Sequence, residues 1–343
     1  MDYSSDTSAP AHPAVLDAMT RANRGMEASY GNDGVSRRLH QKIVDLFETT
    51  EVTVWPCVSG TAANALALSV LCSSTGSILC HEEAHIERDE RGAPEFYTGG
   101  GKLNLLPGAA GQIDETALRD ALAGLQPDFV HETPAEALSL THLTECGTAY
   151  DPGRIAHFAA LAKSSGLGVH LDGARFANAI VGSDATPADL SWKAGVDCLT
   201  LGLTKTGAIG CELILLFGAA RDRHAKLLAH AKRGGHMPPK MRYVAAQAEA
   251  MLTDGLWLSL AETANRAARL LSDGLCQNLD VELVYPVDGN EVFVRMPASL
   301  VETLRSAGVL FYPWPGECFR FVCNWGSSLD ELESLAALVR HQR

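Results

Sequence analysis

The chain has 343 residues, of which 28 are Lys or Arg and 41 are Asp or Glu, and its formal net charge at pH 7 is −13. This excess of negative charge disfavours binding to nucleic acid or to an anionic membrane surface. Hydrophobic residues make up 46% of the chain and charged residues 20%, as in ordinary globular proteins. The length predicts one large domain and a smaller one.

The beginning of the chain and its cysteines indicate a compartment. The segment MDYSSDTSAPAHP has neither the basic nor the apolar region of a secretory signal, and no apolar run is long enough to span a membrane. The nine cysteines are scattered and lack CxxC spacing, which is typical of reduced thiols. We therefore expect a cytoplasmic protein without a membrane or nucleic-acid partner.

From residue 36 to residue 217, helical segments alternate with short apolar and β-branched runs. The sequence predicts helices at residues 36–47, 60–71, 115–123 and 151–165. It predicts strands at residues 51–58, 77–81, 129–132, 168–172, 198–203 and 212–217. Strands separated by helical crossovers indicate an α/β fold, with a mostly parallel sheet covered by helices on both faces. In such sheets, sites form beyond the carboxyl ends of the strands.

The character of the chain changes after the Gly- and Pro-rich segment KRGGHMPPK. The sequence then predicts a long helix at residues 241–272, strands at residues 291–297 and 319–325, and a final helix at Leu329–His341. This change predicts a large domain of residues 1–245 and a smaller C-terminal α/β domain of residues 246–343.

The segment LTLGLTKTGAIG, residues 199–210, places Lys205 where a buried strand breaks into a glycine-containing turn. Burial lowers the pKa of a lysine and favours the free amine that imine chemistry needs. The alternative is a surface lysine on a loop.

A second segment, HLDGARFANA at residues 170–179, delivers Asp172 and Arg175 at the end of another apolar stretch. Pyridoxal 5'-phosphate (PLP) and its substrate need a lysine for the aldehyde, a carboxylate for the pyridine nitrogen and an arginine for a carboxylate. A lone Asp is more often a turn or cap residue. Because Asp172 precedes Lys205 by 33 residues, with one helix and one strand between them, we favour the PLP interpretation.

Two further segments suit the same cofactor and substrate. Ser59, Gly60 and Thr61 join a predicted strand to a helix, where exposed amides and the helix dipole favour a phosphate; a simple N-cap is the alternative. Arg320, in FRFV, can bind a carboxylate through two parallel hydrogen bonds, or it can be a solvated arginine of a strand.

Residues 81–85 read HEEAH, which matches the H-E-x-x-H pattern of zinc peptidases. That chemistry needs both histidines on one helical face, whereas SILCH reads as a strand end and the following segment has no helical apolar stripe. We therefore expect no metal. A ring stacked over a flat cofactor is the favoured role for His85, with a loop histidine as the alternative. The run GGGK at residues 99–102 is interpreted as a flexible turn.

Taken together, these segments resemble the threonine aldolase family of fold-type I PLP enzymes, within the β-eliminating lyase superfamily. The resemblance runs over nearly the whole chain and includes DTSAP, SYGNDGVSRRL, PCVSGTAANALAL, AHIERDE, LDGARFANA, TKTGA, NEVFV and FRFV. It implies that Lys205 is the Schiff-base lysine, Asp172 the partner of the pyridine nitrogen and His85 the stacking ring. It also implies that Ser59, Gly60 and Thr61 bind the phosphate.

The resemblance further implies a substrate site and an assembly. Ser8, Arg175 and Arg320 would receive the substrate carboxylate, and Arg175 and Thr204 also belong to the predicted cofactor environment. Two residues would act across a subunit interface of a homodimer or of a tetramer built from dimers: Tyr30 towards a neighbouring site, and Arg242 towards a neighbour's phosphate. Thr204 and Thr206 flank the lysine where many relatives have Ser-Lys-Gly.

The activity that the resemblance implies is retro-aldol cleavage of a β-hydroxy-α-amino acid to glycine and an aldehyde. Threonine, allo-threonine and phenylserine are the candidate substrates, because LSLTHLTECGT and GAPEFYTGGGKL resemble the branch of low-specificity threonine and phenylserine aldolases. The expected base for the β-hydroxyl proton is His142 or a water held by His85. The alternatives are β-elimination or transamination on the same scaffold, a non-catalytic PLP-binding protein, and a zinc peptidase.

Overall fold

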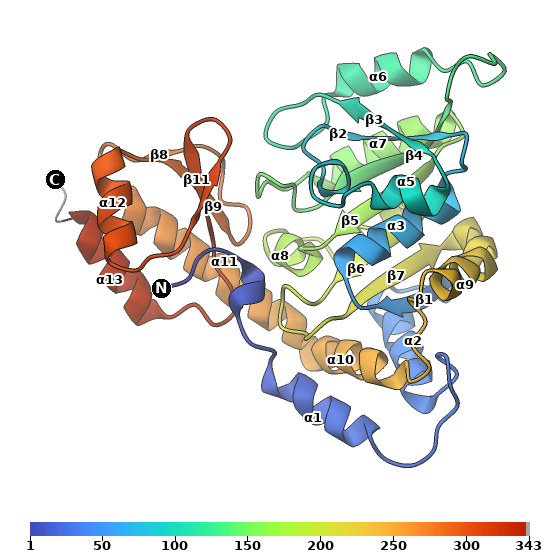
Figure 1. Cartoon of the computed structure of the whole chain (residues 1–343), viewed down its shortest axis with the longest axis horizontal. Helices are drawn as coiled ribbons and strands as arrows, with labels where there is room; N and C mark the ends of the chain where they lie inside the picture. The colour runs from blue at the N-terminus through green and yellow to red at the C-terminus, as the bar shows by residue number, and fades with distance from the viewer. Residues whose placement is uncertain (341–343) are drawn as a thin grey trace.

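The computed structural model describes residues 1–340, which form two sheets with surrounding helices (Figure 1). The larger sheet has seven strands in the order β1-β7-β6-β5-β4-β2-β3. Its strands are β1 (Val52–Cys57), β2 (Ser77–His81), β3 (Lys102–Leu106), β4 (Ala135–Thr141), β5 (Gly168–Gly173), β6 (Cys198–Gly202) and β7 (Glu212–Phe217). Strand β7 pairs antiparallel with β1 and β6, whereas the remaining neighbours pair in parallel.

The helices of this part of the chain pack around the larger sheet. They are α1 (Pro13–Ala22), α2 (Gly34–Leu46), α3 (Gly60–Leu71), α4 (His85–Arg88), α5 (Ala93–Thr98), α6 (Glu115–Ala123), α7 (Pro152–Ser164), α8 (Phe176–Val181), α9 (His224–Arg233) and α10 (Arg242–Leu252). Helix α3 lies against β5, β6 and β7, while α7 contacts β4 and β5, and α8 contacts β6. The predicted α/β fold, a mostly parallel sheet covered by helices, is confirmed.

The core on each face of the sheet follows from the alternation of side chains along a strand. Cys198 and Ile214 belong to a buried cluster with α3, whereas their neighbours Leu199 and Leu215 belong to a second cluster with Phe158. Because both faces are covered, β6 and β7 are buried along their whole length. This covering explains the continuous apolar runs from which the strands were predicted.

The smaller sheet lies in the C-terminal part and is antiparallel, in the order β10-β11-β9-β8. Its strands are β8 (Glu282–Leu283), β9 (Glu291–Arg295), β10 (Tyr312–Trp314) and β11 (Cys318–Val322), and its helices are α11 (Leu256–Leu275), α12 (Ala298–Ser306) and α13 (Leu329–Arg340). The N-terminus lies beside this sheet in Figure 1, where Tyr3 donates its backbone N–H to Leu310 and packs into the C-terminal core. The predicted boundary, residue 245, lies inside α10.

Two local predictions are wrong, each for a physical reason. Residues 129–132 form turns and are largely exposed, and the strand begins only after Pro134. The long helix expected at residues 241–272 is broken at Thr253–Gly255, because Asp254 and Gly255 adopt left-handed conformations. The turn expected at GGGK is present, since Gly99 and Gly100 have φ values of +84° and +123°, and β3 begins at the last residue of this run, Lys102. Residue 341, the expected end of the last helix, lies outside the described residues.

Among residues 1–340, no helix combines the length and the apolar character that crossing a bilayer would require. The nine cysteines are all free, and only Cys276 is exposed. Burial raises the pKa of the eight buried thiols, for example that of Cys57 to about 11. The buried thiols therefore behave as apolar core groups at neutral pH.

Candidate active site

A cavity of about 240 Å³ lies at the carboxyl ends of the central strands. Its walls come from the N-terminus of α3, the ends of β4 and β5, the turn after β6, and the segment that begins α4. A larger hollow of about 370 Å³ lies among α1, α2 and α10, and none of the predicted site residues lines it. The chemistry of the lining side chains, and not the volume, therefore identifies the candidate site.

Lys205 lines this cavity from the turn that follows β6. Within residues 1–340 its amine makes no hydrogen bond and no ion pair. The turn is fixed on both sides of the lysine: the Thr204 hydroxyl accepts a hydrogen bond from the backbone N–H of Cys211 at 3.0 Å, and Thr206 is buried. Gly207 has a φ of +142°, which a residue with a side chain rarely adopts. The turn thus presents an unpartnered amine to the cavity.

Asp172 ends β5 and is 2% exposed. One of its oxygens accepts a hydrogen bond from Nδ2 of Asn64 at 2.7 Å, and the other accepts from the backbone N–H of Ala174 at 3.0 Å. Asn64, on α3, donates from the same nitrogen to Glu90 at 2.8 Å. Asp172 is therefore a buried carboxylate with a fixed orientation, and it lines the same cavity as Lys205.

Ser59, Gly60 and Thr61 line the cavity at the start of α3. The Ser59 hydroxyl accepts a hydrogen bond from the N–H of Ala62 at 3.3 Å, so Ser59 caps the helix. The cap leaves the first N–H groups of the helix without a partner inside the helix. The N-cap and the phosphate interpretations are thus compatible, since both use the same helix end.

His85 begins α4 and lines the cavity. Its Nδ1 atom lies 2.8 Å from Oε1 of Glu90, and its backbone N–H donates to Glu145 at 2.7 Å. The hydrogen bond to Glu90 raises the pKa of His85 above its ordinary value, although burial opposes the shift. His81, by contrast, ends β2, so the two histidines of HEEAH do not share a helical face. No cluster of three or more metal-binding side chains occurs among the described residues.

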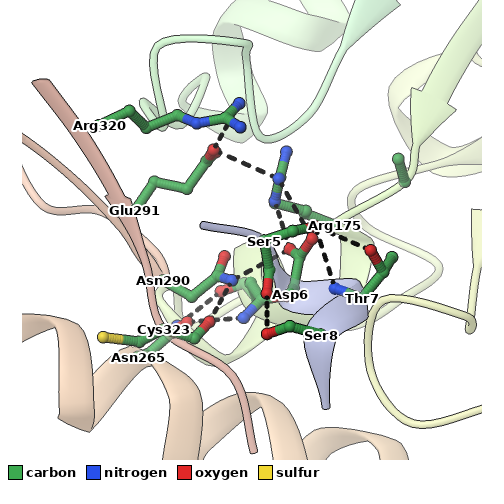
Figure 2. A network of polar contacts seen from close by, with 12 residues as sticks. Ser5, Asp6, Thr7, Ser8, Arg175, Asn265, Asn290, Glu291, Arg320 and Cys323 are labelled. Atoms are coloured by element: carbon green, nitrogen blue, oxygen red, sulfur yellow. Dashed lines mark hydrogen bonds and ion pairs between the residues drawn. The ribbon is translucent and has the colours of Figure 1, made fainter. Parts of the chain in front are cut away.

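The two arginines predicted to receive a carboxylate already share one that belongs to the chain (Figure 2). Glu291 Oε1 lies 3.2 Å from Nη2 of Arg175 and 3.9 Å from Nη1 of Arg320. Arg175 also donates from Nε to Asp6 at 2.8 Å. Burial alone would lower the pKa of Arg175, but Asp6 and Glu291 together raise it above its ordinary value. Nε of Arg320 has no hydrogen-bond partner among residues 1–340.

Four predicted substrate or interface residues do not line the cavity: Arg320, described above, and Ser8, Tyr30 and Arg242. The Ser8 hydroxyl donates to the carbonyl of Ser5 at 2.8 Å, and the neighbouring Thr7 lines the cavity instead. Tyr30 is 42% exposed, and Lys232 Nζ lies 4.4 Å from the centre of its ring. Arg242 donates to the carbonyl of Gly25 at 3.2 Å at the start of α10. Within one chain these side chains lie outside the cavity lining.

His142 is buried behind the cavity wall. Its Nδ1 accepts a hydrogen bond from the backbone N–H of Tyr150 at 3.3 Å. Burial lowers its pKa to about 4, so the ring is neutral at pH 7. Its neighbours Thr141 and Leu143 line the cavity, whereas His142 itself does not.

Two buried carboxyl groups of the cavity were not found from the sequence. Glu145 and Glu212 both line it, and burial raises the pKa of each to about 7. The signal for Glu212 was a lone charge at the start of the apolar run ELILLF. Glu145, in LTECGT, had no comparable signal, because a glutamate after a strand end is ordinary.

The residues of this cavity fit PLP. An unpartnered amine, a buried and oriented carboxylate, and a helix N-terminus with free amides all face one hollow of suitable size. These features, on a seven-stranded sheet with a smaller antiparallel sheet, define a fold-type I PLP-dependent enzyme.

Comparison with known proteins gives the family. The chain belongs to the β-eliminating lyase family, whose profile matches residues 2–299, and it is therefore a PLP-dependent lyase. It is 40% identical to a low-specificity L-threonine aldolase of Pseudomonas aeruginosa over 98% of this chain and 96% of the relative. It is 38% identical to one from Pseudomonas sp. strain NCIMB 10558, with the same coverage.

The structural neighbours agree with this family. A threonine aldolase of Leishmania major superposes with a TM-score of 0.91 at 25% identity and covers 99% of both chains. An aminotransferase of Thermus thermophilus superposes with a TM-score of 0.73 at 18% identity, over 100% of this chain and 95% of that one. The second likeness concerns the fold alone.

Proposed function

We propose that this chain is an aldolase that cleaves β-hydroxy-α-amino acids of the threonine, allo-threonine or phenylserine type to glycine and an aldehyde. The observation that carries the proposal is the meeting of Lys205 and Asp172 in one cavity. It is supported by near-full-length relatives that are named as threonine aldolases.

Each group in the cavity has a part in holding the cofactor. Lys205 Nζ is the amine for the cofactor's aldehyde, Asp172 keeps the ring nitrogen protonated, and His85 lies against the ring. The helix N-terminus at Ser59–Thr61 takes the phosphate. When bound, PLP withdraws the electron pair that the broken Cα–Cβ bond leaves behind.

The substrate carboxylate binds at Arg320, beside Arg175, which lines the cavity itself. Arg320 is the freer of the two, since its Nε atom has no hydrogen-bond partner in the described part of the chain, whereas Asp6 accepts a hydrogen bond from Arg175. Fixing the carboxylate decides which of the bonds at Cα is presented for cleavage. The aromatic ring of Trp314 lies beside Arg320, with 5.2 Å between the guanidinium carbon and the centre of the ring.

The β-hydroxyl proton passes to a base on the His85 side of the cavity. Glu90 engages Nδ1 of His85, so Nε2 is the ring atom left for a water or for the hydroxyl itself. Glu145 lies next to this histidine and accepts its backbone N–H. His142 stays an alternative base, and it would act from behind Thr141 and Leu143.

The protein works in the cytoplasm as a homo-oligomer, either a dimer or a tetramer. Tyr30 and Arg242 do not line the cavity of their own chain, which suits side chains that serve a neighbour's site. The segment that precedes Tyr30 carries a fully exposed Met26, which suits an interface. The free, buried thiols suit a reducing compartment.

The test begins with an absorbance spectrum of the purified protein and then measures glycine release from threonine, allo-threonine and phenylserine. Glycine plus an aldehyde supports the proposal, whereas ammonia plus a keto acid supports β-elimination or transamination. In Lys205→Ala the visible band and most of the turnover disappear, while Lys226→Ala, on the exposed face of α9, leaves both unchanged. Normal turnover and an unchanged band in Lys205→Ala would exclude this lysine.

A further inference from the structure

Glu291 is a buried carboxylate placed between the two arginines of the proposed substrate site. It begins β9 and is 1% exposed, and neither of its oxygens accepts a hydrogen bond within residues 1–340. Figure 2 shows its carboxylate pointing between Arg175 and Arg320. The side chain therefore occupies the kind of position that an incoming carboxylate needs.

The charges that face Glu291 come from every element packed around it. Positive groups are Arg175 at the start of α8, Arg320 on β11 and Lys205 in the turn after β6. The negative group is Asp6, from the short 3₁₀ turn at Asp6–Ser8. The loop of residues 144–148 closes the remaining side with Glu145, a second acidic group whose charge acts on Arg175, with the neutral thiol of Cys146, and with Gly147, whose position packs on the Glu291 side chain.

In the holoenzyme the proposed function commits Lys205 to the cofactor, so the fixed charges left around Glu291 are those of Arg175, Arg320 and Asp6. Asp6 and Glu291 together offset the two arginines, so an added carboxylate would give this buried cluster a net negative charge. A buried carboxylate without hydrogen-bond donors is poorly stabilised in its ionised form. In keeping with this, burial raises the pKa of Glu291, although the two arginines oppose the shift.

We propose that Glu291 competes with the substrate carboxylate for Arg320 and takes up one proton from solvent when that carboxylate binds. The proposal rests on the proposed function, which places the substrate carboxylate at this arginine. Glu291 then sets the affinity of the site for α-carboxylates and makes that affinity decrease as the pH rises. Proton uptake restores the charge balance, because a neutral Glu291 leaves one positive charge for the substrate.

The sign of the pH effect follows from linkage. Carboxylate binding raises the pKa of Glu291. Binding is therefore accompanied by proton uptake at any pH between the pKa of Glu291 in the ligand-free enzyme and its pKa in the complex. Affinity for a carboxylate ligand therefore falls by up to about tenfold per pH unit in that window. Glu291→Gln keeps the shape of the side chain and removes its charge, so it should tighten carboxylate binding by about tenfold at about pH 8 and abolish this extra pH dependence.

The experiment titrates the holoenzyme with glycine and with ethanolamine and follows the absorbance of the bound cofactor. The titrations are repeated at several pH values from about pH 6.5 to about pH 9, a range in which ordinary carboxyl groups stay ionised. Both ligands are primary amines, and only glycine has a carboxylate. The ratio of their dissociation constants therefore cancels the titration of the amine. The matched control is Glu282→Gln, which removes an exposed glutamate that pairs with Arg295 at 3.1 Å on the same sheet.

In Glu291→Gln we expect the dissociation constant of glycine to decrease and that of ethanolamine to stay unchanged. In Glu282→Gln both dissociation constants should equal those of the wild type. Glycine binding that is equal or weaker in Glu291→Gln would overturn the proposal, as would an equal change for both ligands. A second measurement uses only the wild-type holoenzyme: calorimetry in two buffers of different ionisation enthalpy should show more proton uptake with glycine than with ethanolamine. Equal uptake would also overturn it.

These outcomes are separate from those of the proposed function. The titrations measure binding of a product and of its carboxylate-free analogue, so they need no bond cleavage. A protein that binds glycine as described but releases none from threonine would contradict the aldolase proposal alone. A protein that releases glycine but shows no difference between the two ligands would contradict the role of Glu291 alone.

Discussion

Nδ1 of His85 lies 2.8 Å from Oε1 of Glu90, a carboxylate buried beneath the cavity. This contact fixes the ring orientation and favours the protonated imidazole, so the neutral form needed in a base appears only at higher pH. In Glu90→Gln the pKa of His85 should fall, and the acidic limb of the kcat/KM profile should move to lower pH. The pH–rate profile measures this, with Glu82→Gln, an exposed neighbour, as the control. An unmoved acidic limb would show that His85 does not set it.

Asn64 keeps two buried carboxylates apart by donating to both Asp172 and Glu90. In Asn64→Ala each carboxylate loses a donor and the two face one another without the amide between them. We expect the free energy of unfolding to decrease by about 1–3 kcal/mol, the usual cost of leaving a buried polar group unsatisfied. PLP should also bind more weakly, because Asp172 loses its fixed orientation. Urea unfolding and cofactor titration measure the two effects, and Asn104→Ala, on the exposed side of β3, should show neither.

Much of the sheet and the two central site residues could be predicted, because they depend on local pattern. Continuous apolar runs mark strands buried on both faces, and Lys205 and Asp172 interrupt such runs. The same rule predicted a strand at residues 129–132, and there it was wrong. Phe129 and Val130 form an apolar run, but both side chains are exposed. Local pattern does not report what covers a segment.

Contacts between distant parts of the chain could not be predicted from local sequence patterns. Asp6 meets Arg175 across 169 positions, and Glu291 reaches the same arginine from the second sheet. Each of these acidic residues reads locally as an ordinary turn or strand-end residue. Their meeting depends on the N-terminal segment packing beside the smaller sheet, which is a property of the whole fold.

The Asp6–Arg175 pair should make stability depend on acidity. Burial opposes ionisation of Asp6, but Arg175 and Lys205 hold its pKa below the ordinary value. A carboxyl group with a depressed pKa contributes stability above its unfolded-state pKa of about 4, and the contribution is lost as the pH falls through the folded-state pKa. Wild type should therefore lose stability below about pH 4 more steeply than Asp6→Asn does.

At neutral pH the wild-type protein should be more stable than Asp6→Asn. Asp6→Asn leaves the buried Arg175 with Glu291 alone, and breaking a buried pair in this way costs about 3 kcal/mol. Unfolding in urea at several pH values measures both effects. Parallel curves for wild type and variant across the acid range would contradict the assignment of this linkage to Asp6.

Gly202, the last residue of β6, lies against the segment that leads into Arg175. A Cβ atom at this position would lie within 2.7 Å of the backbone of Ala174, a contact that rigid main chain cannot relieve without moving. Gly202→Ala should lower the free energy of unfolding by about 1–3 kcal/mol, as expected of overpacking. Because the collision separates the turn that carries Lys205 from the segment that carries Arg175, the KM for threonine should rise as well. Gly326→Ala, whose added Cβ would meet no atom closer than 3.4 Å, is the matched control in unfolding and kinetics. Equal free energies of unfolding and equal KM values in the two variants would contradict this prediction, because they would show that the end of β6 accommodates the added methyl group without disturbing the site.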